Sequence, residues 1–157
     1  MNLGELQGTY TETIQSMGYY PSDTVDAYIP ASTNDLTYWT EDGQEVASHV
    51  IEEEAATWEP SYKYMAFAAG DRPLEIIENP ELDDGSSCLV VKDSYGCAFV
   101  PTLVDNYQTV HVIDFRYTDK NLCDYVIENG IQDVLFVNGM KIGLADTAAA
   151  AILAEVS

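Results

Sequence analysis

The stretch "CLVVKDSYGCAFVP", residues 88–101, places a serine at the point where a run of apolar residues stops. Ser94 follows Asp93 there, and the small residues and Pro101 that come next are typical of a turn into a short helix. Such a turn presents a hydroxyl as a nucleophile, and the N–H group of the serine can donate to an oxyanion. Position alone nevertheless favours a structural role, in which Ser94 caps the helix and Asp93 stabilises the turn.

A serine nucleophile needs a neighbouring base, most often a histidine. His49 lies in an acidic segment with no partner at motif spacing, which predicts a surface side chain. His111 lies in the middle of an apolar run, which predicts packing against a helix. Arg116 could bind an anionic group, but the chain holds 27 acidic residues, so a structural ion pair is the favoured interpretation.

The cysteines do not form a metal-binding or redox motif. Cys88, Cys97 and Cys123 make no Cys-x-x-Cys pair, and two histidines are too few to complete a zinc cluster with them. Each cysteine has apolar neighbours, which is typical of small buried thiols. The sequence therefore predicts no metal and no cofactor.

Three strand-then-helix units from residue 86 onward would position Ser94. Apolar and β-branched runs predict strands at 88–92, 109–114 and 133–138, with one helix ending at Gly130 and a last helix at 145–156. This alternation indicates a parallel sheet, and ligands bind beyond the carboxyl ends of the strands of such a sheet. The residues expected to line that edge with Ser94 are Asp93, Asp114, Arg116, Tyr117 and Asn138.

The first half is less regular and indicates an α+β arrangement. We expect an opening helix at 4–17, a strand at 24–30, a hairpin turning at Asp42-Gly43 and a strand near 64–68. The chain has 157 residues and no internal repeat, which predicts a single domain over 1–157.

Charge excludes several classes of partner. Six Lys and Arg residues stand against 27 Asp and Glu residues, a net charge of -21, so there is no basic patch for nucleic acid or for an anionic membrane surface. No apolar run approaches the ~20 residues that span a bilayer. The N-terminal stretch has no signal-peptide pattern, so we expect either a cytoplasmic protein or a chain that starts after its export signal.

The segment "LVVKDSYGCAFVPTLVDNYQTVHVIDFRYTDKNLCDYVIENGIQDVLFV" resembles the C-terminal region of the DHHW family. These bacterial proteins are similar to SGNH-type hydrolases and to the alginate O-acetyltransferase-like group. The resemblance covers residues 86–138 well, and most of the chain can be laid onto the second half of such a protein. It implies a three-layer α/β fold with a flavodoxin- or SGNH-like parallel sheet in the second half.

The resemblance also implies a function. Ser94 takes the nucleophile position of an esterase or acyltransferase that acts on O-acetyl groups of a cell-envelope glycan, outside the cytoplasm. Gly70 matches a family glycine near the oxyanion, whereas Asp71 stands where the family has asparagine. The family's Asp-His-His-Trp motif, the source of the catalytic Asp-His, is absent from this chain.

Three interpretations remain open. The chain is the second half of a hydrolase-like protein, or it works with a complementing chain that carries the Asp-His, or it is a non-catalytic carbohydrate- or protein-binding module of the bacterial cell envelope. The first is favoured. It predicts an uncovered apolar sheet face and hence self-association, with Tyr19, Tyr20, Tyr38, Trp39, Trp58 and Tyr62 near that face.

Overall fold

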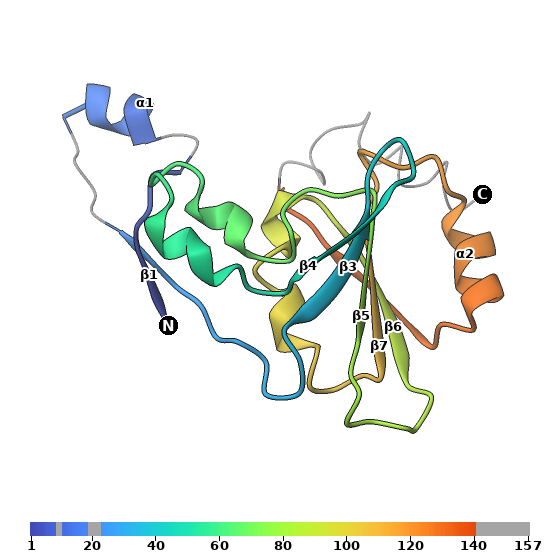
Figure 1. Cartoon of the computed structure of the whole chain (residues 1–157). Helices are drawn as coiled ribbons and strands as arrows, with labels where there is room; N and C mark the ends of the chain where they lie inside the picture. The colour runs from blue at the N-terminus through green and yellow to red at the C-terminus, as the bar shows by residue number, and fades with distance from the viewer. Residues whose placement is uncertain (9–10, 19–22, 141–157) are drawn as a thin grey trace.

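A computed structural model describes residues 1–8, 11–18 and 23–140, and a six-stranded mixed sheet forms its centre (Figure 1). The strand order is β4-β3-β5-β7-β6-β8. The strands are β3 (Asp35–Trp39), β4 (Glu45–His49), β5 (Leu74–Glu78), β6 (Ser87–Lys92), β7 (Thr109–Asp114) and β8 (Asp133–Val137). A separate two-stranded sheet joins β1 (Asn2–Glu5) to β2 (Thr24–Asp26).

The parallel strands expected in the second half are confirmed. β6 pairs in parallel with β7 on one side and with β8 on the other. In this register Lys92, the last residue of β6, lies opposite Asp114 of β7 and Val137 of β8. The carboxyl ends of the three strands therefore meet at one edge, immediately before Ser94.

β6 is buried along its whole length because both faces of the sheet are covered there. Cys88 and Val90 face one apolar core, while Leu89 and Val91 face another. This explains why the strand is a continuous apolar run rather than an alternating one. The second of these cores includes Leu122, from the helix α2 (Leu122–Asn129).

The first half adds three strands, β3, β4 and β5, to the same sheet, whereas β1 and β2 form the separate two-stranded sheet. β3 and β4 form the expected hairpin, and Gly43 in its turn has a φ of 81°, which favours glycine. β3 also pairs with β5, and β5 pairs antiparallel with β7. The fold is thus mixed α/β with the sheet predominating.

Two predictions for the first half were wrong. Residues 4–17 do not form one helix: Gly4, with a φ of 93°, lies in β1, and the helix α1 covers only Thr11–Ser16. Residues 64–68 are not a strand either. The 3-10 helix η2 (Lys63–Ala66) occupies most of that range, and Phe67 makes only an isolated bridge to Ile51.

Two short helices follow β6, the first of them beginning at Ser94. The 3-10 helices η3 (Ser94–Gly96) and η4 (Val100–Thr102) follow β6, with Pro101 in the first turn of η4 as expected. A further 3-10 helix, η1 (Glu53–Thr57), precedes η2. α2 ends at Gly130, whose φ is 63°, as predicted. The helix expected at 145–156 lies outside the described residues.

Within the described ranges, no helix has both the length and the apolar character needed to cross a bilayer. Of the aromatic residues expected near an uncovered face, Tyr62 is exposed, whereas Tyr38, Trp39 and Trp58 are half-buried. Tyr19 and Tyr20 lie outside the described residues. Self-association stays a prediction.

Candidate functional site

Ser94 begins η3, directly after the central strand β6. The cap of this short helix is Asp93, whose Oδ1 accepts a hydrogen bond from the Tyr95 N–H at 2.9 Å. Ser94 does not cap the helix, and in the described part of the chain neither its hydroxyl nor its N–H group makes a hydrogen bond. Both groups are thus available, one as a nucleophile and the other as an oxyanion donor.

The end of β8 is held against the Ser94 turn. The Gly139 N–H donates to Asp93 Oδ2 at 2.9 Å, so Asp93 ties two strand ends together. A Cβ atom on Gly139 would lie 2.6 Å from Cδ2 of Tyr95, and only glycine fits without a shift of that ring. Asn138 Nδ2 donates to the Val91 carbonyl at 3.4 Å. Asp93 and Asn138 therefore lie at the expected edge, where they support the turn.

A pocket of about 360 Å³ opens beside Ser94. The N-terminal segment supplies most of its wall, which neither composition nor motif spacing had indicated. Tyr64 of η2 lies in this wall, and its hydroxyl donates to the Tyr95 carbonyl at 3.2 Å. The other lining residues include Leu6, Gln7, Thr11, Ile14 and Ser61.

A buried cluster of charges lies beneath the edge. The Lys92 side chain is fully buried, and its Nζ lies 3.6 Å from Asp114 Oδ2, 3.7 Å from Glu75 Oε1 and 3.7 Å from Asp71 Oδ1. Arg116 donates to both carboxylate oxygens of Asp114, at 2.9 and 2.6 Å, and approaches Asp71 at 3.0 Å. The predicted structural ion pair of Arg116 is thus present.

Burial determines the protonation of this cluster. It raises the pKa of the Glu75 carboxyl well above its ordinary value, although nearby Lys92 opposes the shift. Neither Glu75 oxygen has a hydrogen-bond partner among the described residues. Burial lowers the pKa of the Lys92 ammonium group, but Glu75, Cys97 and Asp114 raise it by more. Lys92 therefore stays charged, while Glu75 is shifted toward its neutral form.

Gly70 lies at the end of an unusual turn that is fastened to the Ser94 strand. Ala68, Ala69 and Gly70 all have positive φ values, of 47°, 51° and 83°. The Gly70 carbonyl accepts from Lys92 Nζ at 3.0 Å and from Cys97 Sγ at 3.3 Å. Its N–H donates to the Phe67 carbonyl at 3.0 Å, so in this conformation that group is not open to an oxyanion.

The remaining candidates are placed apart from Ser94 or serve structure. Asp114 is fully buried and bound by Arg116, while Tyr117 is 40% exposed with the Arg116 guanidinium 5.2 Å from its ring centroid. Cys88 and Cys97 are buried thiols, each with its pKa raised by burial to about 12. The expectation of a buried thiol is wrong for Cys123, because its place on the solvent side of α2 leaves it exposed.

Neither histidine reaches the Ser94 pocket. His49, on the edge strand β4, is exposed and lies 3.2 Å from Glu52 Oε1. His111 is buried in β7, its Nδ1 2.9 Å from the Tyr125 hydroxyl, and burial lowers its pKa. The described residues also contain no group of three or more His, Cys, Asp or Glu side chains that could hold a metal ion.

Comparisons with known proteins point to one family. The model of the DHHW protein family matches residues 1–113, a range that includes the first half of the chain. A DHHW family protein from Eubacterium siraeum, a solved structure, is 29% identical with a TM-score of 0.75, over 94% of this chain and 50% of that one. No curated protein matches the sequence.

Two solved structures of Bacillus cereus PatB1 are more distant. The one with a sulfonyl adduct is 25% identical with a TM-score of 0.63, over 75% of this chain and 41% of that one. The other is 21% identical with a TM-score of 0.63, over 88% of this chain and 47% of that one, and supports the fold alone. The chain thus spans about half the length of these solved proteins.

Proposed function

The chain belongs to the DHHW family, and from that premise we propose that Ser94 is the nucleophile of an SGNH-like esterase or carbohydrate O-acetyltransferase domain. The observation that carries the proposal is the placement of the Ser94 hydroxyl. It lies at the carboxyl end of a central parallel strand, in the wall of a pocket, with no hydrogen bond to the described chain. A hydroxyl that only stabilised the turn would be bonded within it, and Asp93 already performs that task.

The chemistry would follow the general course of acyl transfer by a serine. The Ser94 oxygen attacks the carbonyl carbon of an ester, and its proton passes to a base. The Ser94 N–H donates to the oxyanion that develops. The bond to the leaving alcohol then breaks, the alcohol takes up the proton, and the acyl group stays on Ser94 until water or an acceptor hydroxyl accepts it.

The base is proposed to come from outside the described residues, in a segment or chain that brings an Asp-His pair to the pocket. Both histidines of this chain are committed elsewhere, His49 to Glu52 and His111 to Tyr125. Loss of the base from a serine triad lowers the rate by several orders of magnitude. The chain by itself should therefore be a slow catalyst with a reactive-serine geometry.

The sulfonyl adduct of PatB1 is consistent with this chemistry. Sulfonyl reagents are captured by nucleophilic side chains, and the PatB1 structure with such an adduct aligns with 75% of this chain. The acyl donor and the glycan acceptor at a bacterial cell envelope are part of the same proposal. Membership of the DHHW family is the sole basis for proposing this donor and this acceptor.

Covalent labelling tests the proposal. The full chain is treated with a fluorophosphonate, with neutral imidazole added as a substitute base, and adducts are measured by intact mass and peptide mapping. We expect one adduct on Ser94, formed faster as imidazole increases, absent in Ser94→Ala and retained in Ser16→Ala, an exposed serine of α1. An adduct that persists in Ser94→Ala would refute the assignment.

A second function is favoured by the position of the two histidines. A chain with this fold and no base at the serine is suited to be a non-catalytic carbohydrate- or protein-binding module. The labelling experiment separates the two, because a binding module should give no Ser94 adduct even at high imidazole.

A further inference from the structure

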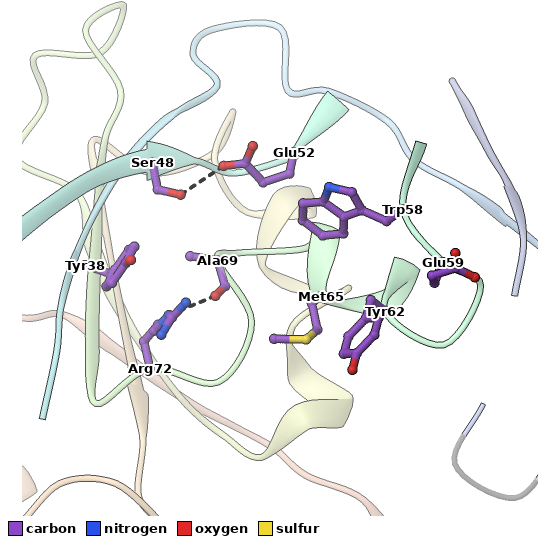
Figure 2. A pocket seen from close by; sticks show the side chains of 9 residues that line it. All are labelled: Tyr38, Ser48, Glu52, Trp58, Glu59, Tyr62, Met65, Ala69 and Arg72. Atoms are coloured by element: carbon purple, nitrogen blue, oxygen red, sulfur yellow. Dashed lines mark hydrogen bonds between the residues drawn. The ribbon is translucent and has the colours of Figure 1, made fainter. Parts of the chain in front are cut away.

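A second pocket is lined by residues of the η1–η2 region and of β3 and β4, and it has a different character. It is open, with a volume of about 490 Å³, and Figure 2 shows three aromatic side chains around it, Tyr38, Trp58 and Tyr62. Trp58 and Tyr38 are half-buried, whereas Tyr62 is 59% exposed. Partly exposed aromatic side chains around a concave surface are typical of a binding site rather than of a core.

The polar groups of this pocket are fixed in place by the protein. Arg72 Nε donates to the Ala69 carbonyl at 3.0 Å, and its guanidinium lies 4.3 Å from the centroid of the Tyr38 ring. On the far side, Glu52 Oε1 accepts from the Ser48 hydroxyl at 3.0 Å. Figure 2 shows both bonds among the side chains that line the pocket. Groups held in this way lose little freedom when a ligand binds.

The terminal nitrogens of Arg72 form no ion pair in the described part of the chain, although the chain carries 27 acidic residues and the charge of Arg72 lowers the pKa of nearby Glu75. The other arginine, Arg116, is by contrast bound to Asp114 and Asp71. Arg72 thus contributes planar donors to the pocket lining, and Glu52 and Glu59 supply acceptors in the same lining. The lining thus holds a positively charged donor and negatively charged acceptors. This combination favours a neutral ligand with many hydroxyl groups over a polyanion, which the carboxylates would repel.

We infer that this pocket binds a neutral pyranose unit of a glycan. The polarised C–H groups of a sugar ring can stack on the negative faces of Tyr62 and Trp58, while its hydroxyls accept from Arg72 and donate to Glu52. The volume of about 490 Å³ lies within the range of small-molecule sites.

The pocket shares its structural support with the Ser94 site. Ala69, which lines it, belongs to the left-handed turn whose next residue, Gly70, is held by Lys92 and Cys97. η2 contributes Met65 to this pocket and Tyr64 to the other. We link the two pockets by inferring that one glycan is bound in the aromatic pocket and deacylated or acylated at Ser94. This link rests on the proposed function.

Fluorescence of Trp58 tests the inference on the full chain. The chain has two tryptophans, so Trp39→Phe leaves Trp58 as the only reporter. The probes are chitotriose and cellotriose as neutral trisaccharides, and trigalacturonate as an anionic one. We expect a saturable change in emission with at least one neutral probe, and none with trigalacturonate.

The matched variants use exposed tyrosines, so that folding is preserved. Tyr62→Ala should weaken binding about tenfold, the loss expected for one stacked ring. Tyr28→Ala, whose side chain is 82% exposed and outside this pocket, should leave affinity unchanged. No saturable change with either neutral probe, or equal affinity in Tyr62→Ala, would overturn the inference. Binding without Ser94 labelling would refute only the catalytic proposal, because this readout needs no reaction at Ser94.

Discussion

Replacing Lys92 by methionine should destabilise the protein more than any surface change. The Lys92 side chain is fully buried, and Nζ is the cation nearest to Glu75, which itself is fully buried. Methionine keeps most of the volume but removes the charge and the hydrogen bond to the Gly70 carbonyl. The variant would leave two buried carboxyl groups, Glu75 and Asp114, without their shared ammonium group.

The loss of free energy of unfolding in Lys92→Met depends on how Asp114 and Glu75 respond to the missing ammonium group. Removing one member of a buried ion pair costs about 3–5 kcal/mol. Asp114 keeps its three hydrogen bonds from Arg116, and Glu75 can take up a proton because burial already raises its pKa. Both responses reduce the cost, so we expect a loss of about 3 kcal/mol, at the lower end of that range.

Urea unfolding at pH 7, followed by tryptophan fluorescence, measures this loss. A domain of this size has a free energy of unfolding of about 5–15 kcal/mol, so the variant should still fold. The double variant Lys92→Met/Glu75→Leu removes the second uncompensated group and should recover part of the loss. A loss of less than about 1 kcal/mol in Lys92→Met, or a double variant less stable than the single one, would refute the reasoning.

Two further predictions concern the same region. Burial raises the pKa of Glu75, so the contribution of its neutral form to stability is complete below about pH 4.5 and is lost as pH rises through the folded pKa. In Glu75→Gln the free energy of unfolding should lack this slope of about 1.4 kcal/mol per pH unit. Urea unfolding of both proteins at several pH values measures the slope, and a constant difference between variant and wild type would contradict the assignment. Gly96→Ala should cost about 1–3 kcal/mol, because its Cβ would lie 2.5 Å from Cβ of Lys92 and 2.9 Å from the Val137 carbonyl oxygen. Thermal unfolding checks this against Gly8→Ala, which has open space around it, and equal effects of the two changes would count against the packing argument.

The strands that carry Ser94 could be predicted because their sequence signal is local. Cys88 to Val91 is an uninterrupted apolar run, and such a run is typical of a strand buried on both faces. β5 was not predicted from the sequence, because its burial depends on a residue from another part of the chain. It carries Glu75, and an acidic residue in a five-residue segment normally indicates exposure, whereas here a lysine from another strand offsets the burial.

The site itself depended on contacts that sequence spacing does not encode. Lys92 and Gly70 are distant in sequence, and nothing about either residue indicates that the ammonium group of one holds the carbonyl of the other. Ala68 and Ala69 adopt left-handed φ values, although alanine gives no signal for them. The pocket wall formed by the N-terminal segment was hidden by the wrong prediction of a helix at 4–17.

The position of β6 in the sheet has a consequence for synthesis on the ribosome. β3, β4 and β5 pair only with one another and with β7, so a three-stranded antiparallel unit can assemble as soon as β5 has emerged. β6 is different, because both of its neighbours, β7 and β8, are made after it. At elongation rates of about 5–20 residues per second, residues 93–114 take about 1–4 s to add. During that interval the strand that is buried along its whole length in the folded protein has no partner, and this nascent segment is where a chaperone would be needed most.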